Sequence, residues 1–184
     1  MARRISLVAA LLVALASGCS GSDERAAPVA KGVTAVGDSV MLGAAPDLER
    51  EIPGIAIDAR EGRQFAEGLE VVRALRDAGD LGDIVVVALG TNGPITTELV
   101  DEMLGLLEGV DRVVFVSNRV PQPWEAPNNA ILQEVSARYE NVALVDWHSA
   151  GEGHPEYFWD GVHLAPDGAR AFALLVSAEI ENAS

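Results

Sequence analysis

The sequence predicts a three-layer α/β/α domain built on a five-stranded parallel sheet. Five short runs rich in β-branched residues alternate with five stretches of helical period, and the third run is apolar without interruption. An uninterrupted apolar run is expected where helices cover both faces of a parallel sheet. The predicted strands are Val33–Gly37, Ile55–Ala59, Asp83–Leu89, Arg112–Ser117 and Val142–Asp146. The predicted helices lie near Met41–Glu51, Gln64–Ala78, Thr96–Glu108, Asn128–Tyr139 and Pro166–Ile180.

The amino-terminal segment has the pattern of an export signal. Arg3 and Arg4 precede an apolar run over residues 5–16, which is shorter than the roughly 20 residues that span a bilayer. The sequence Leu15-Ala-Ser-Gly-Cys19 resembles a bacterial lipobox. We therefore expect a signal peptide over 1–18, a lipidated Cys19 that opens a flexible tether over 19–31, and a single domain over 32–184. A cleaved secretory peptide or a twin-arginine signal at Arg3-Arg4 is the alternative.

Composition and charge narrow the class of partner. The chain has 13 basic against 28 acidic residues, for a net charge of −15, and its basic residues form no cluster. We therefore do not expect this chain to bind nucleic acid, because binding phosphates needs a basic face. No disulfide can form within the chain, since Cys19 is its one cysteine. The chain lacks the glycine-rich phosphate-binding motifs, and we expect no cofactor and no metal.

Polar and glycine residues concentrate in the loops after the predicted strands, where ligands bind in open parallel sheets. Ser39 lies at a turn between a strand and a helix, although such a serine is equally suited to cap the helix. His163 follows Asp160 by three residues, so one short turn can present both to a cleft. The side chain of Asn92 and the backbone of Gly62 offer donors for an oxyanion, but these residue types are also ordinary in turns.

Together these residues resemble the four sequence blocks of the SGNH, or GDSL-type, hydrolases. The matching strings are Gly37-Asp-Ser-Val40, Gly62, Gly90-Thr-Asn-Gly93 and Asp160-Gly-Val-His-Leu164, in that order. The resemblance implies a flavodoxin-like sheet and a triad of Ser39, Asp160 and His163. It also implies an oxyanion hole made of the Ser39 and Gly62 amides and the Asn92 side chain.

Finer features look like the extracytoplasmic domain of bacterial peptidoglycan O-acetyltransferases. They are Asp38-Ser-Val-Met-Leu-Gly-Ala44, Gly62-Arg-Gln64, Arg119-Val-Pro121 with Trp124, and Asp146-Trp147. In that group the domain usually follows a multi-span membrane acyltransferase, a segment that this chain lacks, so we expect a separate membrane protein to donate the acetyl group. The substrate contacts expected from the loops are Arg63, Arg119, Trp124 and Asn129.

The predicted activity is that of an exported, lipid-anchored serine esterase or acyltransferase. It would act on short acyl esters of a cell-envelope glycan such as peptidoglycan, through an acyl-serine. A lipid esterase of the lysophospholipase or thioesterase type and an inactive glycan-binding lipoprotein are the alternatives. A metal hydrolase using Asp146, His154, Asp160 and His163 is a weaker one, because no compact ligand motif is present. His148 and His154 are expected to be solvated loop residues.

Overall fold

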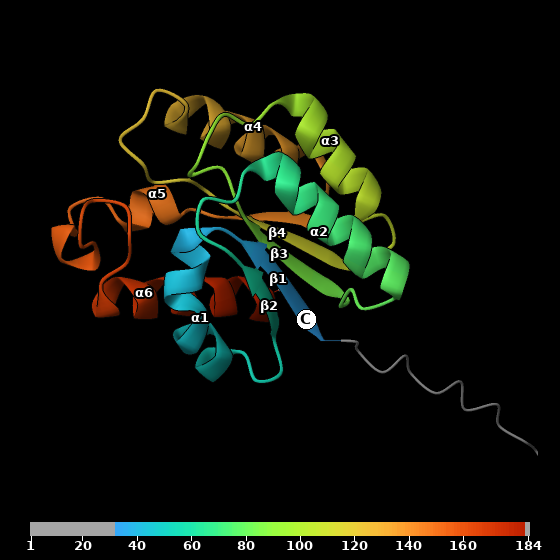
Figure 1. The fold of residues 1–184 in the computed structure, drawn as a ribbon, viewed down its shortest axis with the longest axis horizontal. Helices are drawn as coiled ribbons and strands as arrows, with labels where there is room; N and C mark the ends of the chain where they lie inside the picture. The colour runs from blue at the N-terminus through green and yellow to red at the C-terminus, as the bar shows by residue number, and fades with distance from the viewer. Residues whose placement is uncertain (1–31, 183–184) are drawn as a thin grey trace, which may run out of the picture.

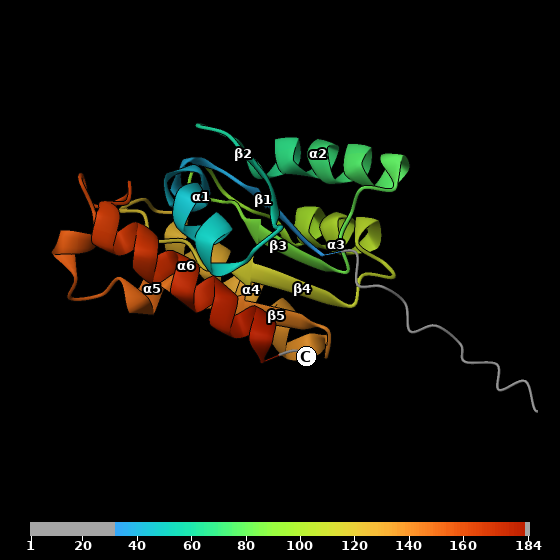
Figure 2. The same ribbon diagram turned by 90° about the horizontal axis from the view of Figure 1, so that it is seen from below.

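Five strands form one parallel sheet in the computed structural model, which describes residues 32–182. The strands are β1 (Val33–Gly37), β2 (Ala56–Ala59), β3 (Ile84–Ala88), β4 (Arg112–Val116) and β5 (Val142–Val145). Their order is β2-β1-β3-β4-β5, and every neighbouring pair is parallel (Figure 2). This order is flavodoxin-like, as predicted. The predicted signal peptide, Cys19 and the tether lie outside the described residues.

Helices cover both faces of the sheet and complete the predicted three layers (Figure 1). On one face lie α1 (Ser39–Glu51) and α6 (Pro166–Glu181), which pack against each other. The other face is covered by α2 (Phe65–Ala78), α3 (Thr97–Leu106) and α4 (Glu125–Arg138). None of the helices within residues 32–182 is both long and apolar enough to cross a membrane.

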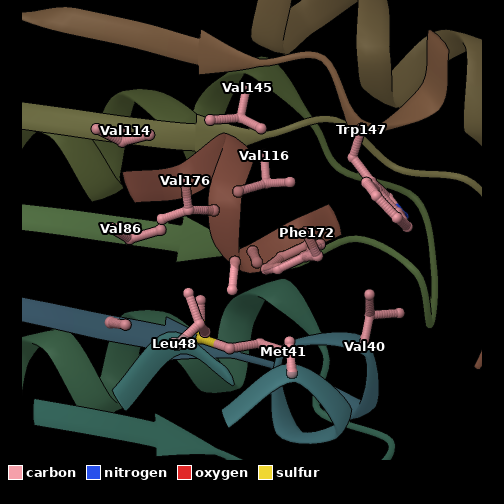
Figure 3. Close-up of a cluster of buried hydrophobic side chains, with 14 of the residues drawn as sticks. Val40, Met41, Leu48, Val86, Val114, Val116, Val145, Trp147, Phe172 and Val176 are labelled. Carbon is pink, nitrogen blue, oxygen red and sulfur yellow. The ribbon is translucent and has the colours of Figure 1, made fainter. Parts of the chain in front are cut away.

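Successive strand residues alternate between the two faces, and each set is buried by its own helices. Val86 and Val114 belong to the core beneath α1 and α6, together with Leu48 and Phe172 (Figure 3). Their neighbours in the same strands, such as Val85 and Phe115, join the core beneath α2, α3 and α4. Because both faces are buried, the strands are apolar without alternation, which is the pattern seen in the sequence.

Three helix boundaries depart from the prediction by two or three residues, and one of them is the end of α3, at Leu106 rather than Glu108. α1 begins at Ser39 rather than Met41, because the Asp38 side chain caps it by accepting the Val40 N–H at 3.0 Å. α4 begins at Glu125 rather than Asn128, since Pro127 lies in its first turn, where proline is tolerated. The short helices α5 (Trp147–Ala150) and η1 (Pro155–Tyr157) were not predicted.

Candidate active site

Ser39 is the first residue of α1, directly after the carboxyl end of β1. The turn requires glycine at position 37, because a Cβ there would lie 2.4 Å from the Cβ of Met41. Asp38 is fully buried and fixes the turn, since its carboxylate accepts the backbone N–H groups of Val40 at 3.0 Å and Thr91 at 3.3 Å. Ser39 itself is half-buried at a helix amino terminus, where the helix dipole favours developing negative charge.

The pKa of the buried Asp38 carboxyl reflects the surroundings of the residue that precedes Ser39. Burial raises its pKa above the ordinary value, and the hydrogen bonds from Val40 and Thr91 oppose that rise. The interaction with His163 is a further, smaller contribution that opposes the rise in the pKa of Asp38.

Asp160 and His163 form a hydrogen-bonded pair in the loop before α6. The Nδ1 of His163 lies 2.7 Å from Oδ2 of Asp160, while Oδ1 of Asp160 accepts the backbone N–H groups of Val162 and His163 at 3.0 and 2.8 Å. The hydrogen bond to the His163 side chain, followed by these backbone bonds, lowers the pKa of Asp160 to about 2. The carboxylate is therefore charged at neutral pH and orients the imidazole, leaving Nε2 for proton transfer.

The loop with this pair packs against the start of α1. A Cβ placed on Gly43 would lie 3.8 Å from Cβ of Leu164, the residue after His163, so the two segments are in contact. The bridge between Phe158 and Leu164 closes the loop, and both side chains are buried. This packing brings the loop that carries His163 against α1, the helix that begins at Ser39.

The two segments predicted to form the oxyanion hole are tied together. Gly62 has a φ of +70°, a conformation that favours glycine, and lies in the loop before α2. The Asn92 side chain donates one N–H to the carbonyl of Arg63 at 3.3 Å, and the Gln64 side chain donates to the carbonyl of Asn92 at 2.7 Å. An amide carries two such donors, so the Asn92 side chain retains a second N–H for an oxyanion.

Arg63 fixes the position of the loop before α2 from the protein interior. It is only 5% exposed, and its guanidinium donates to the carbonyls of Gly37 at 3.0 Å and Asp58 at 2.6 Å, and to the Asp58 carboxylate at 2.6 Å. These bonds join the loop before α2 to the end of β1. Arg63 was expected to contact substrate, but its burial and its three bonds within the protein make it a positioning residue.

A buried asparagine network, which the sequence did not reveal, fixes the loop that follows β3. Asn128 of α4 is fully buried and donates to the carbonyls of Gly90 and Gly93 at 3.1 and 3.0 Å, while it accepts the N–H of Ile95 at 2.7 Å. Asn118 donates to the carbonyl of Leu89 at 2.9 Å. The loop that presents Asn92 is therefore held from both ends.

The remaining expected substrate residues occupy different positions. Asn129 uses its amide to bond the backbone of Asn118, at 2.6 and 2.8 Å, so it too positions a loop. Trp124 is half-buried and donates its indole N–H to the Thr91 carbonyl at 3.3 Å, beside Asn92. The guanidinium carbon of Arg119 lies 5.1 Å from the centre of the Phe158 ring. Trp124 and Arg119 thus remain next to the site.

Each of the other two histidines lies beside its own glutamate. Nδ1 of His148 lies 3.3 Å from Glu125, and that of His154 lies 2.8 Å from Glu156 and its ring stacks on Tyr157. Neither joins the Asp160–His163 pair. Among residues 32–182, no three His, Cys, Asp or Glu side chains are grouped closely enough to hold a metal ion.

Two curated relatives are similar to most of this chain. No protein-family model matches the chain. The chain is 38% identical over 154 residues to the YrhL protein of Bacillus subtilis (strain 168). This alignment covers 83% of this chain and 24% of YrhL. It is 38% identical over 148 residues to the O-acetyltransferase OatA of Staphylococcus aureus (strain NCTC 8325 / PS 47), covering 79% of this chain and 24% of OatA. The chain thus spans about a quarter of the length of these curated relatives.

Solved structures agree on the fold. The carboxy-terminal catalytic domain of the peptidoglycan O-acetyltransferase OatA of Streptococcus pneumoniae, solved with a methylsulfonyl adduct, superposes with a TM-score of 0.77 at 23% identity. The match covers 84% of this chain and 95% of that domain. A GDSL-like lipase from Bacteroides thetaiotaomicron matches with a TM-score of 0.63 at 22% identity, over 84% of this chain and 89% of the lipase. Residues 32–182 thus form a domain of the SGNH/GDSL hydrolase fold, and the chain is homologous to a segment of the bacterial peptidoglycan O-acetyltransferases.

Proposed function

We propose that this chain is an extracytoplasmic serine enzyme that moves acetyl groups on or off peptidoglycan through an acetyl-Ser39 intermediate. The observation that carries the proposal is the 2.7 Å bond between Asp160 and His163 in a loop packed on α1, the helix that begins at Ser39. The relatives named as O-acetyltransferases support the acetyl group, and the pneumococcal relative, named as a peptidoglycan O-acetyltransferase, supports the polymer.

The chemistry has two halves. Ser39 Oγ attacks the acetyl carbonyl while Nε2 of His163 takes its proton, and the ionised Asp160 stabilises the imidazolium. The charge that develops on the carbonyl oxygen is held by the Ser39 and Gly62 amides and the second N–H of the Asn92 side chain. The leaving group takes the proton from His163 as the acetyl-serine forms. A sugar hydroxyl or water, deprotonated by His163, then attacks the acetyl carbon, and His163 returns that proton to Ser39 Oγ as the bond from the serine to the acetyl group breaks.

The relatives named as O-acetyltransferases also favour acetyl esters over the lipid-esterase alternative.

The location of the enzyme is part of the proposal. The apolar run over 5–16 followed by Cys19 supports export and a lipid anchor, and a separate membrane protein would supply the acetyl group. Labelling the cells with a radioactive fatty acid, and comparing Cys19→Ala, tests the anchor. An unlabelled wild-type chain would contradict it.

The test of the enzyme is trapping of the acetyl-serine. Mixing the full chain with 4-nitrophenyl acetate and quenching should add one acetyl group to the intact mass, on the peptide that contains Ser39. Ser39→Ala should gain none, and Ser149→Ala, which alters a serine in α5, should behave as wild type. A wild-type protein that neither gains the acetyl group nor releases nitrophenol contradicts the proposal and leaves the inactive glycan-binding protein as the better account.

A further inference from the structure

Among the described residues, a highly exposed aromatic side chain lies next to the triad. Trp159 is 73% exposed, whereas Leu42, Tyr139, Leu174 and Leu175 are between 37 and 49% exposed. Single exposed apolar residues are common, so exposure alone indicates nothing. The place of Trp159 in the chain, directly before Asp160, makes it a candidate for binding.

Backbone pairing places Trp159 on the same face as His163. Phe158 and Leu164 form an antiparallel bridge, which is flanked by the bonds from Trp159 N to His163 O and from Ala165 N to Tyr157 O, both 2.8 Å. Residues 159 and 163 are thus opposite each other in a short hairpin. Facing residues of an antiparallel pair project to the same side, with Cβ atoms about 5 Å apart. Phe158 and Leu164 face the core, so Trp159 and His163 face away from it.

The backbone beneath Trp159 is firmly held. Phe158 is buried and packs at 5.8 Å, centre to centre, against the buried Trp147 ring. A flat ring on a fixed backbone loses little conformational freedom when a ligand covers it. Trp159 therefore has the properties of a preformed apolar platform, directly across the hairpin from the general base.

We infer that Trp159 stacks against the apolar face of a neutral pyranose ring of the acceptor glycan and so presents one of its hydroxyl groups to His163. This inference rests on the proposed function, because the acceptor is the species that His163 must deprotonate. The hydroxyl has to approach within hydrogen-bond reach of Nε2. The exposed carboxylates of Glu156 and Asp160, both close to Trp159 in the chain, disfavour an anionic sugar.

The platform also bears on the choice between transfer and hydrolysis. Water needs no platform, whereas a sugar gains local concentration at the acetyl-serine by stacking. Loss of the indole should therefore shift the acetyl-enzyme from transfer toward hydrolysis, an effect that a merely structural role would not produce.

Binding is tested separately from the reaction, in the full chain carrying Ser39→Ala. Oligosaccharides of N-acetylglucosamine, titrated by calorimetry, should bind about tenfold more weakly after Trp159→Ala, since the stacked faces remove on the order of 60 Å² of apolar surface from water. Trp159→Phe should recover most of the affinity. Tyr139→Ala, which removes a 41% exposed ring next to the amino end of β5, is the matched control and should bind as the parent. Oligogalacturonate, an anionic chain, should bind more weakly than the neutral one.

The inference is overturned if Trp159→Ala and its parent, both carrying Ser39→Ala, bind the oligosaccharide with equal affinity. It is also overturned if wild type and Trp159→Ala, both retaining Ser39, transfer the same fraction of acetyl groups to sugar rather than to water. These outcomes are distinct from failure of the enzyme proposal. A wild-type chain that forms no acetyl-Ser39, yet binds the oligosaccharide through Trp159, contradicts the enzyme and supports the platform.

Discussion

The loops proposed to form the oxyanion hole and the loop of the proposed base are held in opposite ways. The loops that carry Gly62 and Asn92 are fixed by buried side chains, with Asn128 fully buried and Arg63 only 5% exposed. The side chains of His163 and Asp160 are 53 and 55% exposed, and their loop is held mainly by bonds within residues 157–165. Oxyanion donors act through preorganisation, whereas the base must meet an incoming acceptor. The burial of the first two loops and the exposure of the third suit these two proposed tasks.

The largest expected effect is a loss of activity without a loss of stability, after a change in the Asp160–His163 pair. Asp160→Asn should lower kcat by about 10³-fold, because an amide neither holds the required tautomer of His163 nor stabilises the imidazolium. The unfolding midpoint should change little, since exposed ion pairs contribute little to stability. Glu156→Gln is the control, because it alters a second exposed carboxylate–histidine pair of 2.8 Å and should keep full activity. Acetyl-ester kinetics that show less than a tenfold loss would mean that another group orients His163.

Breaking the oxyanion side should instead cost both stability and rate. Asn128→Ala leaves the carbonyls of Gly90 and Gly93 and the N–H of Ile95 without their partner, so the free energy of unfolding should fall by about 3 kcal/mol. Denaturant unfolding measures it, and Asn141→Ala, an exposed residue with one 3.3 Å bond, should lose less than about 0.5 kcal/mol. A stable Asn128→Ala protein with full activity would remove the contrast between the two sides.

A smaller effect is expected where the positioning residue keeps its charge. Arg63→Lys preserves the cation but loses the planar fork that reaches Gly37 and Asp58, so unfolding should become easier by about 1 to 2 kcal/mol. Because the Arg63 carbonyl accepts from Asn92, kcat should fall while KM changes little. Arg138→Lys, in an exposed pair with Glu134, is the control. A rise in KM alone would return Arg63 to the substrate-contact role.

The smallest effect sharpens the comparison through pH. Burial raises the pKa of Asp38, so the folded protein holds this proton at pH values where the unfolded chain has released it. The associated stability is present below the ordinary value of 3.8 and is lost as pH rises through the folded pKa. Asp38→Asn has no such proton, so the stability of wild type relative to Asp38→Asn should decline from pH 4 upward. The raised pKa would be contradicted if the free energies of unfolding of wild type and Asp38→Asn differed by the same amount at every pH in this range.

Much of the fold was accessible from the sequence because burial on both faces produces apolar runs. All five strands were predicted within one residue at each end, and the flavodoxin-like order followed from the family resemblance. The helix α5 was missed because four residues, held by the Asp146 side chain, are too few to show a helical period. Pro127 hid the first turn of α4 in the same local way.

The site was accessible only in its outer layer. Residues at strand ends could be picked out by type, which found Ser39, Asn92 and His163 as candidates. The roles of Arg63 and Asn128 depend on partners such as Gly37 and Gly93, which lie 26 and 35 positions away, and no local pattern contains such pairings. Trp159 could not be identified from the sequence because a tryptophan is usually part of a core, and the structure shows through its 73% exposure and the hairpin register that this one faces outward.

The direction of β1 sets how the domain is oriented with respect to whatever precedes it. β1 begins at Val33 and ends at Gly37, two residues before Ser39, and its direction can be followed in Figure 1. Five extended residues span about 16 Å. Any polypeptide continuous with Gly32 thus enters at the edge remote from Ser39. In the proposed anchored protein, the edge of the sheet at Val33 would face the anchoring surface, and the opposite edge, next to Ser39, would face away from it.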